Sequence, residues 1–149
     1  MTEQTTILAP IRYPLTAQSA RTLAVAGRLA HDLAPADLRV LHVNLYQVGN
    51  DTQTAELTRA ISSTLDGVEA SVTTRRGFLV EEVILDEAIQ IGADIVVVGA
   101  NQQATWRQFL SRLLRNDPNV SSFLREHVPD WIEVMEVDTV AETPTAEPV

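Results

Sequence analysis

A group of polar and charged side chains follows a glycine at the end of an apolar run, as in a ligand-binding loop. The run "IVVVG" ends at Gly99, and Asn101, Gln102, Arg107 and Asn119 follow it with no further glycine in the chain. Glycine-rich loops bind phosphate through converging backbone N–H groups, whereas arginine holds phosphate or carboxylate through paired side-chain donors. This stretch therefore indicates an anion or nucleotide pocket that depends on side chains.

Three further candidates stand where two earlier apolar runs end. Pro10 and Arg12 close the run "TTILAPI", and Asn44 closes "LRVLHVN". The carboxyl ends of parallel strands meet at one edge of a sheet, where α/β proteins bind their ligands. Two interpretations stay open for the arginines: they bind an anion, or those after Gly99 form the solvated face of a helix.

Several kinds of chemistry are excluded or unsupported. The chain has no cysteine, and all eleven basic residues are arginine, so thiolate, Schiff-base and P-loop lysine chemistry are absent. The three histidines lack metal-ligand spacing, and His42 is expected to be a hydrogen-bonded core residue. No catalytic residue or metal ligand is assigned, so an enzyme is not expected; a nucleotide hydrolase is the less favoured alternative.

Charge and hydropathy narrow the class of protein. The formal net charge of −9 argues against nucleic-acid binding, and no apolar run is long enough for a membrane span. The N-terminal residues do not resemble a signal peptide, so a cytoplasmic location is expected. The acidic, lysine-free composition fits either a halophile or a high-GC genome.

Hydrophobic periodicity predicts alternating strands and helices. The strands are expected at residues 5–11, 38–44, 70–75, 95–98 and 131–137, and the helices at 16–33, 51–65, 77–91, 105–115 and 119–127. Such alternation predicts one α/β domain over residues 1–137, with an open, parallel, five-stranded, Rossmann-like sheet covered by helices on both faces. Residues 138–149 are predicted to be a disordered acidic tail. The acidic residues of the third helix are expected to form a solvated face: Glu81, Glu82, Asp86 and Glu87.

The chain resembles the universal stress protein family over residues 5–137. Residues 7–33 are similar to the family's first strand, polar loop and alanine-rich helix, and "LRVLHVN" is similar to its second strand. The most specific match is "GFLVEEVILDEAIQIGADIVVVGA", which resembles the third helix and fourth strand. The resemblance implies the adenine-nucleotide α-hydrolase-like fold, a non-catalytic role in stress response, and a homodimer formed through the last strand, Trp131 to Val137.

The resemblance also shows where this chain departs from the family's ATP-binding pattern. ATP-binding members have an aspartate after the first strand and a G-x-x-G-x9-G-[ST] loop after the fourth. Here Arg12 takes the aspartate position, Gln102 replaces the second glycine, and Pro118 and Asn119 stand in place of the last pair. Proline has no N–H to donate and Gln102 carries a Cβ, so ATP binding is expected to be weak or absent. An ATP sensor, or a sensor of another nucleotide or phosphate, is the alternative.

Overall fold

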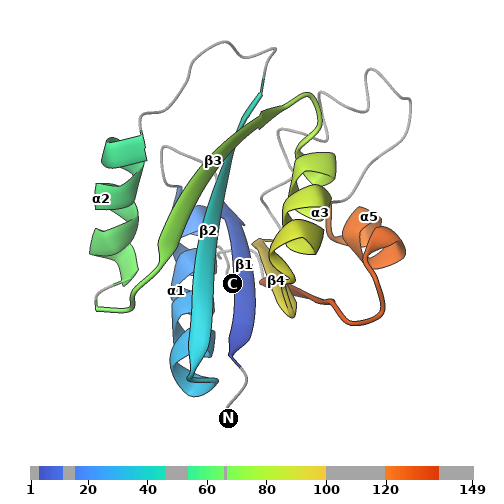
Figure 1. The fold of residues 1–149 in the computed structure, drawn as a ribbon. Coiled ribbons are helices and arrows are strands. Elements are labelled where there is room, and N and C mark those ends of the chain that lie inside the picture. The colour runs from blue at the N-terminus through green and yellow to red at the C-terminus, as the bar shows by residue number, and fades with distance from the viewer. Residues whose placement is uncertain (1–3, 12–15, 46–53, 66, 100–119, 138–149) are drawn as a thin grey trace, which may run out of the picture.

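The protein is an α/β sandwich built around one parallel sheet (Figure 1). The computed structural model describes residues 4–11, 16–45, 54–65, 67–99 and 120–137. The elements in chain order are β1 (Thr5–Ile11), α1 (Ala17–Asp32), β2 (Ala36–Leu45), α2 (Thr54–Leu65), β3 (Ser71–Gly77), α3 (Val80–Ile91), β4 (Ile95–Gly99), α5 (Val120–His127) and β5 (Glu133–Val137). The strands are arranged β3-β2-β1-β4-β5, and every neighbouring pair is parallel. The predicted fold class is confirmed.

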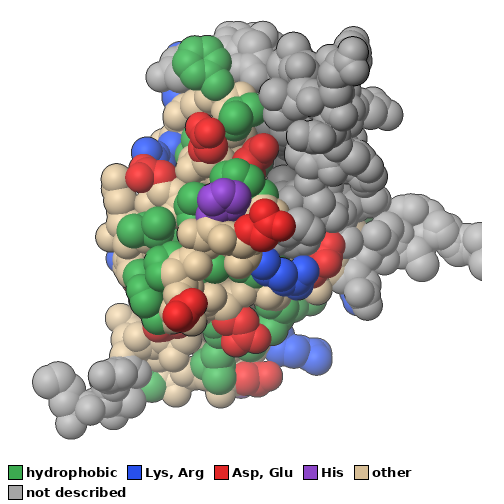
Figure 2. Space-filling view, turned by 90° about the vertical axis from the view of Figure 1, so that its right-hand side faces the viewer, with side chains coloured by type: hydrophobic (Ala, Val, Ile, Leu, Met, Phe, Trp, Pro, Cys, Tyr) green, Lys and Arg blue, Asp and Glu red, His purple; other side chains and the backbone are tan. Residues whose placement is uncertain are grey.

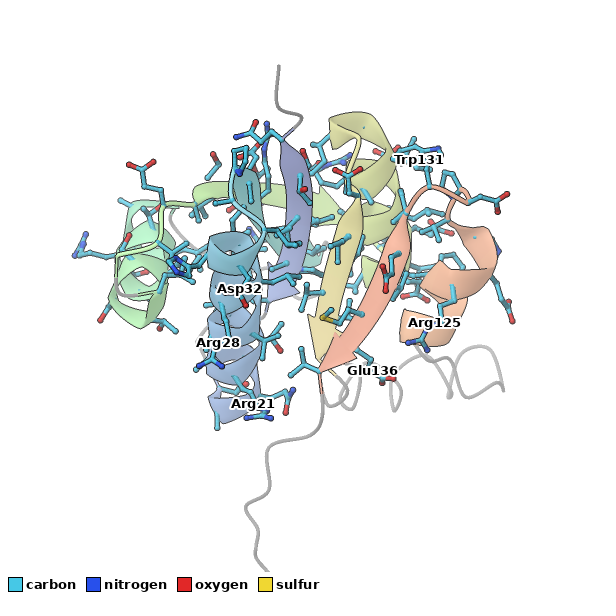
Figure 3. The ribbon with its side chains drawn as sticks, turned by 90° about the horizontal axis from the view of Figure 1, so that it is seen from below. Arg21, Arg28, Asp32, Arg125, Trp131 and Glu136 are labelled. Carbon is cyan, nitrogen blue, oxygen red and sulfur yellow. The ribbon has the colours of Figure 1, made fainter. Side chains whose placement is uncertain are left out.

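Two apolar clusters cover the two faces of the sheet. Alternate strand residues such as Ile7 and Val40 pack with α1 and α2, whereas Leu8 and Leu41 pack with α3 and α5. Side chains alternate between the faces along each strand, so the central strands are apolar on both sides. The view in Figure 3 shows α1 and α3 on opposite sides of the sheet.

Local sequence signals set the ends of the helices. Thr16 caps α1, and its Oγ1 accepts a hydrogen bond from the Ser19 N–H at 3.0 Å. At the other end of the sheet, Gly92 closes α3 in the left-handed conformation, with a φ of 68°. Asp94 then joins β4 to β1, because its carboxylate accepts from the Thr6 N–H at 2.9 Å and its N–H donates to the Thr6 carbonyl at 2.8 Å. These contacts fix the amino edge of the sheet.

Two wrong boundaries have a clear physical cause, besides shifts of one or two residues at the ends of β2 and β3. Gly77 does not open the third helix; it ends β3, where it pairs with Leu45, and α3 begins at Val80. A Cβ at Gly77 would collide with Val83, so the glycine allows α3 to pack closely against β3. The last strand begins at Glu133, because Trp131 lies in a turn in which the Ile132 N–H donates to the Pro129 carbonyl.

Some predictions fall outside the described residues. The helix expected at residues 105–115 and the tail expected at 138–149 both lie outside the described residues. The domain boundary after residue 137 therefore stays a prediction. Among the described helices, none combines the length and the apolar character that crossing a membrane requires.

Candidate functional site

The candidate site lies where the order of the strands reverses. β1 pairs with β2 on one side and with β4 on the other, so the chain proceeds from β1 in opposite directions across the sheet. In open parallel sheets a crevice forms at this switch point, beyond the carboxyl ends of the strands. The prediction that the first and fourth strands are neighbours is confirmed.

Three of the eight predicted site residues can be placed, and they lie at the ends of three adjacent strands. Asn44 on β2 and Gly99 on β4 share the face covered by α1 and α2, whereas Pro10 on β1 follows the alternation of Leu8 onto the opposite face. The structure therefore brings Asn44 and Gly99 to the same face and separates Pro10 from them. The others lie outside the described residues: Arg12, Asn101, Gln102, Arg107 and Asn119.

A buried polar group beside Gly99 was missed in the sequence. Gln18 and Thr22 on α1 are 8% and 0% exposed, and the Thr22 hydroxyl donates to the Gln18 carbonyl at 2.9 Å. Asn44, 7% exposed, adds a buried amide at the end of β2. The available signal was the spacing of Gln18 and Thr22, four residues apart on the apolar stripe of α1. The α1 side of the switch point is therefore polar as well as buried.

Gly99 has a packing role that does not involve phosphate. A Cβ built on Gly99 would lie 2.7 Å from the Thr22 Oγ1 and 2.9 Å from the Gln18 Nε2. At such distances the Thr22 and Gln18 side chains would have to shift to make room for a Cβ. The glycine at the end of β4 therefore favours the close approach of α1.

We expect Gly99→Ala to destabilise the protein by about 1–3 kcal/mol, the usual cost of forcing extra atoms into a packed interior. Chemical denaturation measures this loss. Thr22→Ala removes one of the two colliding atoms, so the double variant Gly99→Ala/Thr22→Ala should lose less stability than the two single changes added together. An unchanged free energy of unfolding in Gly99→Ala would contradict the packing role.

His42 lies within the sheet, as predicted, and is 5% exposed. Burial lowers the pKa of His42, because the charged imidazolium loses its hydration there. The neutral ring is therefore favoured. Among the residues that the structure describes, no three His, Cys, Asp or Glu side chains are grouped to hold a metal ion.

The prediction that the acidic side chains of α3 form a solvated face is wrong for two of the four residues. Glu81 and Glu87 are 4% and 7% exposed, whereas Glu82 and Asp86 lie at the surface. Glu87 is buried because α3 turns this side toward β3, where an arginine neutralises it.

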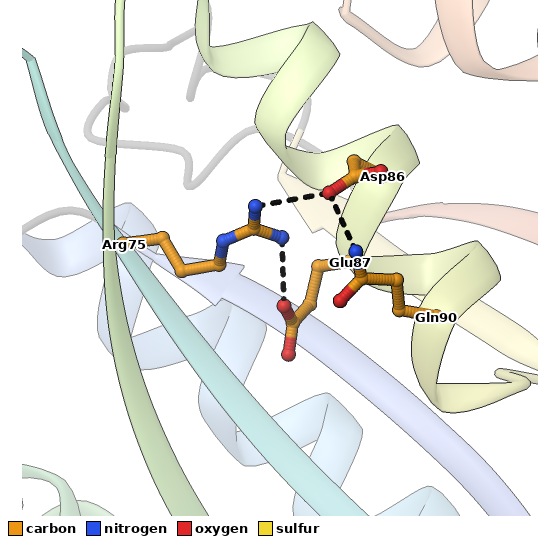
Figure 4. Close-up of polar contacts among 4 residues, drawn as sticks. All are labelled: Arg75, Asp86, Glu87 and Gln90. Atoms are coloured by element: carbon orange, nitrogen blue, oxygen red, sulfur yellow. Dashed lines mark hydrogen bonds and ion pairs between the residues drawn. The ribbon is translucent and has the colours of Figure 1, made fainter.

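Arg75 of β3 is the arginine that binds α3 (Figure 4). Its Nη1 lies 3.0 Å from Glu87 Oε1, and its Nη2 lies 2.9 Å from Asp86 Oδ2. Gln90 completes the group by donating from Nε2 to the same Asp86 oxygen at 3.2 Å. The hydrogen bond to Asp86 is the largest cause of the raised pKa of Arg75. We refer to Arg75, Asp86, Glu87 and Gln90 as the α3 clamp.

The surface over α3 and α5 carries charges of both signs. Figure 2 shows acidic, basic and apolar side chains interspersed over the described part of this face. Arg125 of α5 and Glu136 of β5 form a long ion pair there, at 4.0 Å. A pair of this length at the surface contributes little stability.

The sequence matches no protein-family model and no curated protein. Solved structures with the same fold are found at low sequence identity. A universal stress protein in complex with cAMP is 16% identical, with a TM-score of 0.60, over 92% of this chain and 98% of that one. A universal stress protein from Archaeoglobus fulgidus DSM 4304 has a TM-score of 0.61 at 18% identity, over 88% of this chain and 43% of that longer one. Another Archaeoglobus fulgidus universal stress protein, in complex with dAMP, has a TM-score of 0.50 at 14% identity, over 90% and 98% of the two chains.

The strand order and the switch point define the class as an open, doubly wound α/β protein with a Rossmann-like parallel sheet. Within that class, the fold is that of the universal stress proteins. The resemblance seen in the sequence is thus confirmed at the level of the fold.

Proposed function

We propose that this chain is a non-catalytic regulatory protein of the universal stress type, whose crevice at β1 and β4 binds a compact anionic ligand. The observation that carries the proposal is the similarity of the whole fold to universal stress proteins crystallised with cAMP and with dAMP. Both of those ligands carry a single phosphate. An adenosine monophosphate is therefore the ligand class that we propose for this chain, in place of ATP.

We propose a ligand with one phosphate rather than three because the chain keeps few residues of the family's ATP-binding pattern. The loop after β4 keeps only its first glycine, Gly99, and packing against α1 already accounts for that residue. The absence of further glycines, and of an N–H at Pro118, removes backbone donors that the family's pattern offers to a triphosphate. Arginine side chains such as Arg12 and Arg107 can pair with a single phosphate instead.

Calorimetry with cAMP, dAMP and ATP tests this proposal. We expect one of the monophosphates to bind more tightly than ATP, and Arg12→Ala to weaken its binding by about 1–3 kcal/mol, the usual loss for a charged hydrogen bond. Arg28→Ala is the control, because Arg28 lies on the exposed side of α1 (Figure 3). Micromolar binding of ATP that survives Arg12→Ala would contradict the altered pocket, and no binding of any of the three would contradict the ligand class.

We also propose that the protein acts as a homodimer joined through β5. The position of β5 supports this, because it is an edge strand whose outer side has no partner strand within the described chain. Exposed edges are normally covered, since their free N–H and C=O groups recruit other strands. The cytoplasmic location, the halophilic origin and the absence of nucleic-acid and membrane partners stay predictions.

A further inference from the structure

The carboxyl group of Glu81 is buried without the partner that its neighbour has. Glu81 is 4% exposed, and its Oε1 makes no hydrogen bond in the structure described. Glu87, six residues further along α3, is buried to a similar degree but faces the guanidinium of Arg75. A buried polar atom without a partner is rare and calls for a physical explanation.

The direction of Glu81 follows from the contacts of α3. Val83 meets Gly77, and Glu87 meets Arg75, so the side of the helix that carries these two residues faces β3. Side chains advance by about 100° per residue around a helix, which places Glu81 roughly 160° from Val83. Glu81 therefore faces away from β3, on the side of α3 that turns toward the middle of the sheet and α5. Because α3 starts just after the carboxyl end of β3, Glu81 lies near the carboxyl edge that holds the candidate site.

The two ends of α3 are held differently. The α3 clamp attaches the middle of the helix to β3 through Arg75. Among the described residues, the first turn has no ion pair of this kind: Leu79 occupies the N-cap position and provides no side-chain hydrogen bond. The first turn is therefore held by the apolar packing of Val80 rather than by a charged contact to the sheet.

Protonation lowers the free-energy cost of burying the Glu81 carboxyl group. Burial raises the pKa of Glu81 and is the largest effect on it; the charge of Glu82 acts in the same direction, and a backbone hydrogen bond at Glu81 acts against them. The neutral carboxyl can stay buried at modest cost, whereas the ionised form loses its hydration without gaining a cation.

We propose that Glu81 is a proton-linked latch for the first turn of α3. When it is protonated, the turn stays packed against the sheet. When it is ionised, the side chain moves into water, and the turn loosens at the carboxyl edge. The packing of the first turn of α3 at the carboxyl edge of the sheet thereby becomes dependent on pH.

The described charged groups on the elements around α3 do not provide Glu81 with a cation. Arg75 of β3 is engaged by the α3 clamp, whereas Arg76 follows the alternation of Val72 onto the face covered by α1 and α2. Arg39 of β2 pairs with Asp37 at the amino half of the sheet. β1 turns no charged side chain toward α3. α5 contributes Arg125, which pairs with Glu136, the exposed Glu126, and His127, which contacts the Phe123 carbonyl through Nδ1.

Hydrogen exchange measured as a function of pH tests the latch. The readout is protection in a peptide covering residues 78–86, corrected for the intrinsic pH dependence of exchange. In the wild type, opening of the first turn should increase by about tenfold per pH unit between the pKa of a solvated glutamate and the higher folded pKa, and then level off. Glu81→Gln should remove this dependence. Glu82→Gln, the exposed neighbour, should leave the pH dependence in place.

Carbon NMR of the wild-type carboxyl groups gives a second test that needs no variant to fold. The titration midpoint of Glu81 should lie above that of Glu82. The raised pKa also makes stability depend on pH. Protonated Glu81 contributes stability below the pKa that it has in the unfolded chain, and this contribution is lost as the pH rises through its pKa in the folded protein. A midpoint at the ordinary glutamate value, or equal pH dependence in the wild type and Glu81→Gln, would overturn the proposal.

Discussion

Glu136→Pro is expected to convert the proposed dimer into a monomer without unfolding the subunit. The Glu133 N–H donates at 2.9 Å to the carbonyl of Asp94, the residue just before β4. The backbone N–H groups of Glu133 and of every second residue after it therefore point toward β4. Val134 and Glu136 therefore direct their N–H groups toward the open edge, because the bonding direction alternates along a strand. Proline at position 136 removes an outward donor and leaves the ladder to β4 intact, as proline on edge strands generally does.

The effect should be large because a two-fold dimer contains the substitution twice. We expect a loss of about 3 kcal/mol or more, which corresponds to a dissociation constant raised about 100-fold or more. Sedimentation or light scattering over a range of concentrations measures this constant. Glu136→Ala is the matched control: it also removes the ion pair to Arg125 but keeps the N–H, so it should remain dimeric. A wild type that is monomeric at high concentration would refute the dimer itself. A dimeric Glu136→Pro would show that subunits meet elsewhere.

Arg75→Ala is expected to lower the free energy of unfolding by about 2–3 kcal/mol. The guanidinium binds two carboxylates, and the Glu87 side chain that it leaves behind is only 10% exposed. Removing one partner of a buried ion pair costs about 3–5 kcal/mol. The expected loss is smaller here because Arg75 is 30% exposed and Asp86 is 51% exposed, so water screens part of the interaction.

Two comparisons isolate the cause of this loss. Arg39→Ala breaks a pair of the same length, 2.9 Å, in which the arginine and its aspartate are 38% and 25% exposed. It should cost about 1 kcal/mol or less, as exposed pairs do. Glu87→Gln added to Arg75→Ala should recover part of the loss, because a neutral amide is easier to bury than a carboxylate. Chemical denaturation of the three variants would contradict the clamp if Arg75→Ala cost no more than Arg39→Ala.

Much of the fold could be predicted from local patterns. Thr16 marked the start of α1, because a threonine before an apolar stripe at helical spacing is a typical cap. The run Ile95 to Val98 predicted a central strand, because a parallel strand buried on both faces is continuously apolar. The alternation of such runs with helical spacing then left few topologies, since parallel strands need right-handed crossovers.

The candidate site could be predicted only as a location. The positions of the strand ends in the sequence identified Asn44 and Gly99 as candidates. They did not reveal that α1 packs against Gly99, so the packing role of this glycine and the buried amide of Gln18 were missed. Contacts of this kind join residues far apart in the chain. No local spacing records how closely a helix approaches a strand.

The sequence by itself determined the order of the elements and the edge of the sheet at which a ligand would bind, because hydrophobic periodicity and chain connectivity are local properties. The tertiary structure alone decided the environment of each charge. Glu81, Glu82 and Glu87 are the same residue type on one helix, yet one is exposed, one is neutralised by Arg75, and one is buried with an unpaired oxygen. The free energy of a carboxylate depends on its hydration and on the charges nearby, and both are set by what packs against the helix.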